Sequence, residues 1–167
     1  MITDYSVSKK GIMMDNILTD FESQNCCGCL ACVKTCPFGA LHPSRDKYGF
    51  TIPTVDETLC IGCGKCAQVC PYHNSFSSNK KPKTFAAVHR DDAVVLNSSS
   101  GGVFTALAEA VLSEGGVVYG ATMDADFLIR HIRIGNIEAI DKLRKSKYVQ
   151  SNMMDVFQPI KEDLSRN

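Results

Sequence analysis

The chain has 167 residues, of which 44% are hydrophobic and 22% charged, a composition that suits one medium-sized globular domain or two small ones. No stretch is long and apolar enough to span a bilayer and the N-terminus lacks the pattern of a secretory signal, so a cytoplasmic protein is expected. Eighteen Lys and Arg residues balance eighteen Asp and Glu residues, which gives no reason to expect a nucleic-acid partner.

The first segments of the chain are a lead-in and an internal repeat. Residues 1–25 lack sustained periodicity and are expected to form a lead-in segment with a short helix near residues 13–21. CCGCLACVKTCP at residues 26–37 is then echoed by CIGCGKCAQVCP at residues 60–71. Because nine cysteines in a reducing compartment indicate metal or redox chemistry rather than disulfides, their spacing decides the interpretation.

Each cysteine run follows the pattern Cys-x2-Cys-x2-Cys-x3-Cys-Pro, which is the spacing of [4Fe-4S] ligands in bacterial ferredoxins. Three thiolates at two-residue intervals reach three corners of an iron–sulfur cube, and the last cysteine of the other run closes it. The first predicted cluster has the ligands Cys26, Cys29, Cys32 and Cys70. The second has the ligands Cys60, Cys63, Cys66 and Cys36. The pattern therefore predicts a bacterial ferredoxin-like 2[4Fe-4S] domain over residues 26–76 that passes electrons.

Zinc is the alternative for closely spaced cysteines. A structural zinc site, however, uses two Cys-x2-Cys pairs separated by a loop, whereas here three cysteines have equal spacing and each run ends in Cys-Pro. Small residues within the runs allow backbone N–H groups to approach the sulfur atoms, which raises the reduction potential of a cluster. An apolar shell lowers that potential, and two low-potential clusters are expected. Cys27 fits no ligand position and is interpreted as structural, with a redox role as the alternative.

Between and beyond the runs, local patterns predict a hairpin and a linker. Residues 40–56 alternate weakly and carry a turn signal at residues 46–49, which predicts a β-hairpin. The polar stretch YHNSFSSNKKPK at residues 72–83 predicts a boundary between two packed units.

The second half of the chain predicts a small mixed α/β unit. Strands are expected at residues 84–89, 117–122 and 127–134, with a turn at residues 124–126. Helices are expected at residues 101–113, 137–145 and 153–164. The first helix should end at Gly115 and Gly116 and should bury one apolar face. That face consists of Phe104, Leu107, Val111 and Leu112.

Two further blocks give the chain a specific family resemblance. SSSGGVFTALAEAVLSEGGVVYGATMD at residues 98–124 and RKSKYVQSNM at residues 144–153, together with the cysteine runs, resemble the N-terminal part of the coenzyme F420 hydrogenase/dehydrogenase beta-subunit family. The likeness extends from about Cys26 to the C-terminus and implies that residues 84–167 form the N-terminal domain of this type, in incomplete form.

Members of that family are iron–sulfur flavoproteins that move electrons between clusters, FAD and a partner. The partner is the deazaflavin coenzyme F420 in methanogens, and many relatives occur in anaerobic bacteria that lack the deazaflavin. Family members usually continue well past the KYVQS block, so the chain resembles a truncated protein, a fragment or one half of a split protein. The resemblance thus implies a missing C-terminal domain or a separate redox partner protein.

The candidate flavin residues lie in the same two blocks. Free N–H groups and the helix dipole at a helix start favour an anion such as a flavin diphosphate, although Ser as an N-cap and Gly for a tight turn explain the sequence equally well. These candidates are Ser99, Ser100, Gly101 and Gly102. Lys147, with Tyr148 and Gln150, is expected near the flavin ring or its phosphates, the alternative being a solvated helix end followed by an ordinary strand. No Gly-x-Gly-x-x-Gly turn follows a strand, which argues against a Rossmann site.

Taken together, the sequence predicts an α+β protein that is a subunit or fragment of a flavin-dependent oxidoreductase. Its two [4Fe-4S] clusters would relay electrons to and from a flavin, FAD, with coenzyme F420 as substrate implied by resemblance alone. The alternative is a stand-alone ferredoxin-like carrier whose second unit docks a redox partner and has no flavin of its own.

Overall fold

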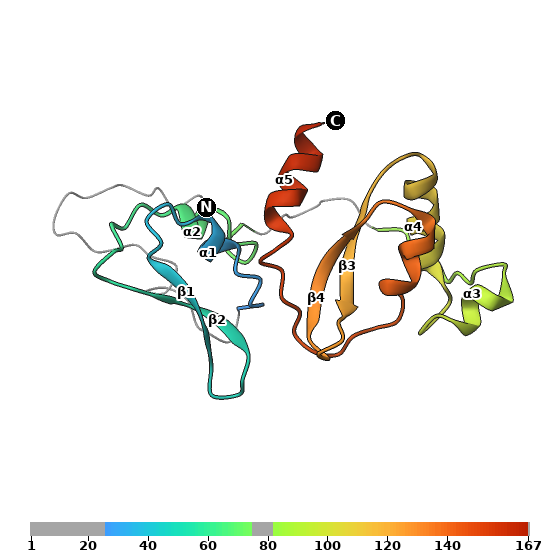
Figure 1. The fold of residues 1–167 in the computed structure, drawn as a ribbon, viewed down its shortest axis with the longest axis horizontal. Coiled ribbons are helices and arrows are strands. Elements are labelled where there is room, and N and C mark those ends of the chain that lie inside the picture. The colour runs from blue at the N-terminus through green and yellow to red at the C-terminus, as the bar shows by residue number, and fades with distance from the viewer. Residues whose placement is uncertain (1–25, 75–81, 167) are drawn as a thin grey trace.

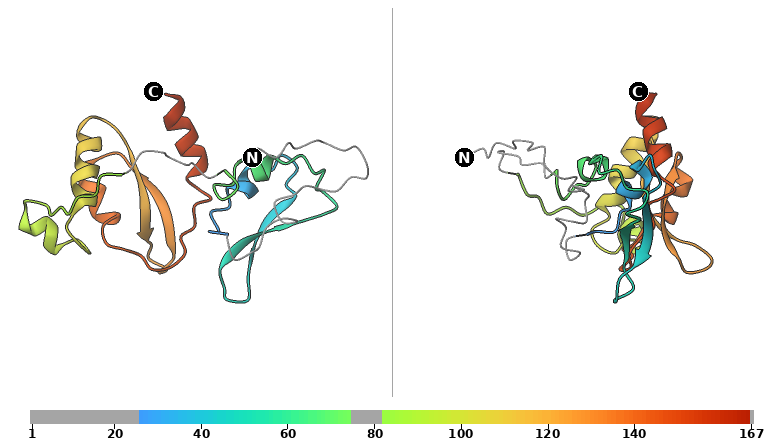
Figure 2. Two further views of the ribbon diagram at one scale, coloured as in Figure 1. Left: turned by 180° about the vertical axis from the view of Figure 1, so that it is seen from behind. Right: turned by 90° about the vertical axis from the view of Figure 1, so that its left-hand side faces the viewer.

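A computed structural model describes residues 26–74 and 82–166, so the helix expected near residues 13–21 lies outside the described residues. The elements form two groups side by side, and the view from behind shows the same division (Figures 1 and 2). The N-terminal group contains α1 (Ala31–Thr35), β1 (Leu41–Arg45), β2 (Thr51–Val55) and α2 (Lys65–Gln68). The C-terminal group contains α3 (Asp92–Leu96), α4 (Val103–Ser113), β3 (Val118–Met123), β4 (Ile129–Ile134), the 3-10 helix η2 (Ile137–Lys142) and α5 (Phe157–Ser165). The predicted mixed α+β content is confirmed.

The hairpin predicted between the cysteine runs is present. Strands β1 and β2 pair antiparallel, from Leu41 opposite Val55 to the turn end of the hairpin. The turn is held by the carboxylate of Asp46, whose Oδ1 accepts hydrogen bonds from the N–H of Tyr48 at 2.9 Å and of Phe50 at 2.8 Å. The hairpin thus packs next to α1 and places its two strands beside the cysteine loops.

The sequence repeat of the two cysteine runs is also a structural repeat. Gly28 and Gly62, two residues after the first cysteine of each run, both have a positive φ, of 65° and 67°. Leu30 and Gly64 occupy the next equivalent positions, again with positive φ, and are the N-caps of α1 and α2. Each of these helices carries the third cysteine of its run, and the two helices contact each other.

The second group is built on an antiparallel pair of strands covered by α4 and η2. Strands β3 and β4 pair from Val118 opposite Ile134 to Met123 opposite Ile129, which confirms the two predicted strands and the turn between them. The core between this pair and the helices consists of Ala108, Leu112, Ile134, Ile140 and Leu143. None of the described helices is both long and apolar enough to cross a membrane.

The strand expected at residues 84–89 is wrong. This segment has no strand partner, and residues 84–88 are exposed. At its end, the N–H of His89 donates to the carbonyl of Gly101 at 2.7 Å. Sequence analysis also missed α3, a single short helix whose N-cap Asp91 accepts a hydrogen bond from the N–H of Ala93 at 2.8 Å.

Helix α4 confirms the prediction for residues 101–113, but the predicted buried face is mostly wrong. The residues expected in the core that are instead exposed are Phe104, Leu107 and Val111. The buried face consists of Thr105, Ala108 and Leu112, at positions i, i+3 and i+7. The small side chains of Thr105 and Ala108 suit this face because η2 and β3 pack directly against it.

The other two predicted helices are present near their expected positions, but their boundaries differ from the prediction. In place of the α-helix expected at residues 137–145, Ile137–Lys142 form the 3-10 helix η2. Its N-cap is Asn136, whose Oδ1 accepts a hydrogen bond from the N–H of Ala139 at 3.0 Å. The helix expected at residues 153–164 begins later, at Phe157, because Asn152 first pairs with Arg130 beside β4. Gly115, with φ of 80°, follows the end of α4 as predicted.

Candidate functional site

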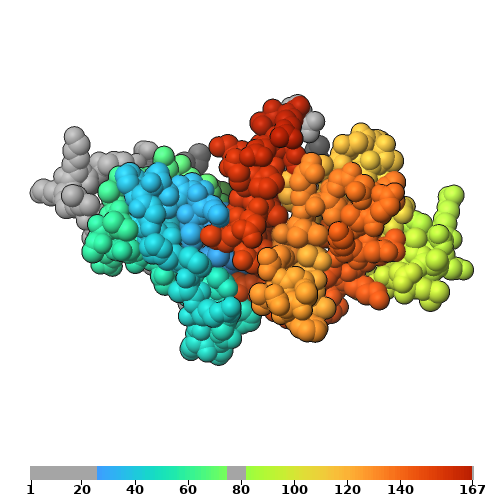
Figure 3. Space-filling view, viewed as in Figure 1, coloured from blue at the N-terminus to red at the C-terminus, as the bar shows by residue number. Residues whose placement is uncertain are grey.

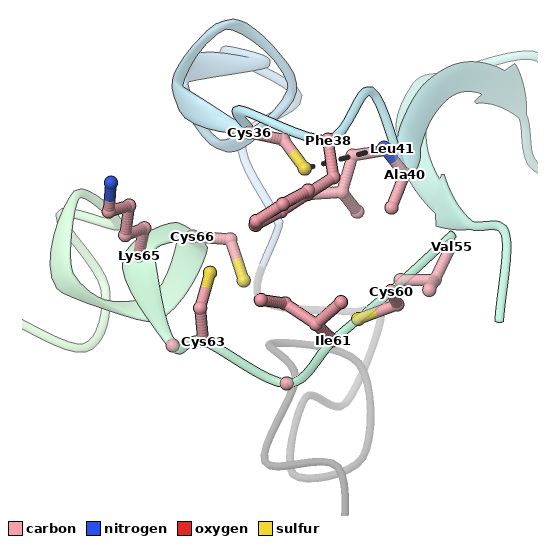
Figure 4. A pocket seen from close by; sticks show the side chains of 12 residues that line it. Cys36, Phe38, Ala40, Leu41, Val55, Cys60, Ile61, Cys63, Lys65 and Cys66 are labelled. Carbon is pink, nitrogen blue, oxygen red and sulfur yellow. Dashed lines mark hydrogen bonds between the residues drawn. The ribbon is translucent and has the colours of Figure 1, made fainter. Parts of the chain in front are cut away.

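The four cysteines predicted to hold the second cluster line one cavity, drawn in Figure 4. They are Cys36 from the first run and Cys60, Cys63 and Cys66 from the second. The walls between them are apolar and include Ala40, Leu41 and Val55. The N–H of Ala40 donates to the Sγ of Cys36 at 3.3 Å, which is the kind of hydrogen bond that stabilises negative charge on sulfur. The fold therefore brings the last cysteine of one run to the first three of the other.

Two apolar side chains reach into the space between these sulfurs. Phe38 and Ile61 both line the cavity, and Figure 4 shows them between the cysteines. Their exposed fractions are 47% and 61%. A cluster bound among the four sulfurs would share this space with both side chains, and their exposure to solvent leaves them free to turn outward.

Three of the four cysteines predicted for the first cluster, Cys26, Cys29 and Cys32, lie in the loop before α1 and in α1 itself. Burial is the main cause that raises the pKa of Cys26 and of Cys29, and it raises the pKa of Cys32 to about 12. Cys70 contributes as well, because its nearby negative charge further raises the pKa of Cys26. Such half-buried thiolates need a compensating cation, and iron supplies that charge in a cluster.

Cys70 lies with the first run, as the crossed arrangement requires. It packs against the buried cluster formed by Cys32 and Leu41. The first sulfur of the run also has a hydrogen-bond donor, because the N–H of Gly28 donates to the Sγ of Cys26 at 3.3 Å. Cys27 has an exposed side chain. Within residues 26–74 and 82–166, no three His, Cys, Asp or Glu side chains are placed to hold a single metal ion.

The residues predicted to bind a flavin diphosphate line a second cavity, of about 370 Å³. Ser99, Ser100, Gly101 and Gly102 form one wall of this cavity. The opposite wall comes from residues 143–146, and the N–H of Ser146 donates to the Oγ of Ser99 at 2.9 Å. The volume falls in the range of small-molecule sites. The two sequence blocks that carry the family resemblance therefore face each other across one cavity.

The start of α4 differs from a serine-capped helix. Its N-cap is Gly102, and no side chain accepts a hydrogen bond from the first N–H groups of the helix. Ser98 instead donates its hydroxyl to the carbonyl of Val94 at 2.7 Å, at the end of α3. The N–H groups at this helix start are thus not satisfied by the serines that precede them.

Lys147 does not line the cavity. Its Nζ donates to the carbonyls of Leu143 at 3.1 Å and Arg144 at 2.6 Å, and burial lowers its pKa. The cations that do line the cavity are Arg144 and Lys145, which sequence analysis did not single out although they belong to the same block. Arg144 is paired with Asp141 at 2.6 Å, whereas Lys145 is exposed.

The other two residues expected near a flavin lie elsewhere. Tyr148 is 93% exposed, and neither it nor Gln150 lines the cavity. Gln150 reaches across to the first group of elements, where it contacts the backbone of Thr51. The structure therefore brings together four of the seven residues expected near a flavin and places Lys147, Tyr148 and Gln150 away from them.

Family models match both halves of the chain. A family model for a 4Fe-4S dicluster domain matches residues 25–74, and a second model of the same description matches residues 52–112, which contain the second cysteine run alone. A model for the N-terminal part of the coenzyme F420 hydrogenase/dehydrogenase beta subunit matches residues 84–158. The search of curated proteins found no match. The dicluster match implies two [4Fe-4S] clusters. The chain thus consists of a region similar to 4Fe-4S dicluster domains followed by a region similar to the N-terminal domain of coenzyme F420 hydrogenase/dehydrogenase beta subunits.

Proposed function

We propose that this chain is the electron-relay part of a flavin-dependent oxidoreductase, in which two [4Fe-4S] clusters exchange electrons with FAD held by the second group of elements. The observation that carries the proposal is the coexistence of two sites in one chain. One is the crossed arrangement of the cysteines, and the other is the cavity between residues 98–104 and 143–146. Coenzyme F420 is the candidate organic substrate because of the family, and a further domain or a separate protein is the candidate redox partner.

The first site would hold the clusters through the eight cysteines of the two runs. When bound, the clusters supply one-electron chemistry, and a flavin can pair two such electrons into a hydride equivalent. The chain contributes apolar walls that exclude water, among them Leu41 and Val55. It also contributes the N–H donors of Gly28 and Ala40, which stabilise added negative charge on the sulfurs they contact.

The second site would hold the diphosphate of FAD. The 11-residue helix α4 begins at the cavity, and its first N–H groups and positive dipole end favour an anion there. Lys145 adds an exposed positive charge on the opposite wall, while Arg144 is already paired with Asp141. Lys147 is directed at backbone carbonyls, so its proposed role passes to Lys145.

Flavin retention in a charge-reversal pair tests this assignment. The chain is purified and reconstituted without oxygen, incubated with FAD and passed through gel filtration, with iron, sulfide and FAD measured in the protein peak. Lys145→Glu places a negative charge in the cavity and should abolish FAD retention without loss of iron. Lys161→Glu makes the same change on exposed α5 and should retain FAD as the wild type does.

Two outcomes would contradict the proposal. A protein that holds its iron but never retains FAD would be a carrier without a flavin, which is the alternative function. Equal FAD retention in the Lys145→Glu and Lys161→Glu variants would mean that a flavin binds away from this cavity.

A further inference from the structure

The side chain of Gln150 makes a direct contact between the two groups of elements. Its Oε1 accepts a hydrogen bond from the N–H of Thr51 at 2.6 Å, and its Nε2 donates to the carbonyl of Thr51 at 3.0 Å. A third, longer bond runs from Nε2 to the carbonyl of Cys27 at 3.5 Å. One half-buried side chain therefore contacts both the hairpin and the loop of the first cysteine run.

The contact at Thr51 imitates the pairing of two strands. Thr51 is the first residue of β2, and β2 pairs on one side with β1. An open strand edge carries N–H and C=O groups that need partners. The amide of Gln150 satisfies both groups of one residue, as an opposite residue does in an antiparallel ladder.

The loop of the first cysteine run is packed directly against this amide. Gly28, between Cys26 and Cys29, is buried. A Cβ at Gly28 would collide with the Nε2 of Gln150 and with the carbonyl of Thr51. The position of Gln150 therefore depends on the position of the loop that carries the first predicted cluster ligands, and the reverse also holds.

Gln150 is fixed just as firmly to the second group. The next residue, Ser151, has its Oγ 2.8 Å from the Nδ1 of His131 on β4. The backbone of Asn152 makes two hydrogen bonds to β4. Its carbonyl accepts from the N–H of His131 at 2.8 Å, and its N–H donates to the carbonyl of Ile129 at 2.9 Å. In the space-filling view, the C-terminal part of the chain lies between the N-terminal group and the other elements of the C-terminal group (Figure 3). The link from β4 to the first cysteine loop thus consists of well-bonded residues.

We propose that Gln150 is a positioning residue for electron transfer, which couples the second group of elements to the loop of Cys26 and Cys29. It does so through its paired hydrogen bonds to Thr51 and its contact with the Cys27 carbonyl. The inference rests on the proposed function, because the relay is what it positions. Since Gln150 touches the first cysteine run and does not line the cavity of the second set, a charge introduced at position 150 should act on the first cluster more than on the second.

Two substitutions distinguish the effect of losing the hydrogen bonds from the effect of adding a charge. Gln150→Ala removes the partners of Thr51, so its amide hydrogen should exchange about tenfold faster in the reconstituted full chain. Gln150→Glu adds a negative charge beside the first cysteine loop, which disfavours the addition of an electron. The potential of the first cluster should therefore fall by more than that of the second, as followed by a redox titration monitored by electron paramagnetic resonance.

Gln158 provides the matched control. It lies exposed on α5, where its Nε2 donates to Glu162 at 2.8 Å. Gln158→Ala and Gln158→Glu should leave the exchange rate of the Thr51 amide hydrogen and the reduction potentials of both clusters at their wild-type values. A merely structural role for Gln150 would change the exchange rate in Gln150→Ala and would leave the potentials of Gln150→Glu unshifted.

The result that overturns the proposal is unchanged Thr51 exchange in Gln150→Ala, or a Gln150→Glu variant in which neither cluster shifts in potential or both shift equally. The flavin measurement gives a separate answer. If the wild type holds clusters but never retains FAD, the proposed oxidoreductase fails, whereas selective effects of Gln150 on exchange and on one potential still establish its coupling role.

Discussion

Two features of the structure, a positive φ and a close contact, both require glycine at position 28. Its φ of 65° lies in the left-handed region, and a Cβ there would collide with Gln150 and Thr51. Gly39 has nearly the same φ, of 60°, and nothing lies within 4 Å of its Cβ position. Comparing substitutions at Gly28 and Gly39 therefore separates the cost of backbone strain from the cost of displacing a contact.

Gly28→Ala should lower the free energy of unfolding more than Gly39→Ala does. Backbone strain alone should cost about 1–2 kcal/mol in both variants. Gly28→Ala must also expel the amide of Gln150, which should cost about 2 kcal/mol more. Chemical denaturation of the reconstituted protein without oxygen measures both. Equal losses in the two variants would show that the close approach of Gly28 to Gln150 and Thr51 contributes nothing to stability.

His131 should make stability depend on pH near neutrality. Burial lowers the pKa of His131 below its usual value, so the folded chain favours the neutral ring whereas the unfolded chain takes up a proton as pH falls through about 6.5. The stabilisation that the neutral His131 ring gives to the folded chain is fully present above that pH and is lost as the pH falls below it. Thermal unfolding at pH 7.5 and 5.5 should show a smaller loss in His131→Gln than in the wild type.

The control for that experiment is His42, which is exposed on β1. His42→Gln should show the same loss of stability between pH 7.5 and 5.5 as the wild type. An undiminished loss in His131→Gln would assign the pH dependence to other groups.

At the scale of the elements, the two hairpins use the same turn with different residues. Asp46 and Asp124 each accept hydrogen bonds from the N–H groups two and four residues ahead. The residue three positions after each aspartate has a positive φ, of 85° at Gly49 and of 60° at Phe127. Glycine adopts this conformation without strain, but phenylalanine does not.

Phe127→Gly should therefore stabilise the protein. Phe127 is 79% exposed, so its removal loses little burial, and relief of the left-handed strain should raise the free energy of unfolding by about 1 kcal/mol. Gly49→Ala is the reciprocal change and should lower it. Denaturant titration checks both, and a destabilised Phe127→Gly variant would show that the phenyl ring makes a favourable contact at the tip.

The accuracy of the sequence predictions follows the range of the interactions that decide each element. Turn residues and β-branched runs are local signals, so both hairpins and the end of α4 at Gly115 were predicted correctly. The strand expected at residues 84–89 depends on a partner strand, which no local pattern supplies. The buried face of α4 was set by the close approach of η2, which selects Thr105 and Ala108 over the larger Phe104 and Leu107.

The candidate site divides in the same way. Cysteine spacing predicted which sulfurs would meet, and the fold places Cys36 with the second run and Cys70 near the first. The direction of long side chains was not predictable, because it depends on tertiary contacts. Lys147 turned to backbone carbonyls and Gln150 to Thr51, although both lie in one block with Lys145, which lines the cavity.

In the whole molecule, one short segment of chain connects the two candidate sites. The cysteine sets lie in the first group of elements, the cavity lies in the second, and residues 150–152 connect β4 to the first cysteine loop. The crossed cysteine arrangement is the part on which the electron relay depends. Each run is incomplete without the last cysteine of the other, so the two runs should bind clusters only as a folded pair.

Cluster content in cysteine variants measures this claim most directly. Anaerobically reconstituted wild type and Cys27→Ser should each contain about eight irons as two [4Fe-4S] clusters, since the exposed Cys27 is in neither set. Cys70→Ser should lose the cluster of Cys26, and Cys63→Ser should lose the other. The electron paramagnetic resonance signal left in Cys70→Ser should then be the one missing from Cys63→Ser. A shared loss of one signal by both variants, or wild-type protein that binds no iron, would contradict the account.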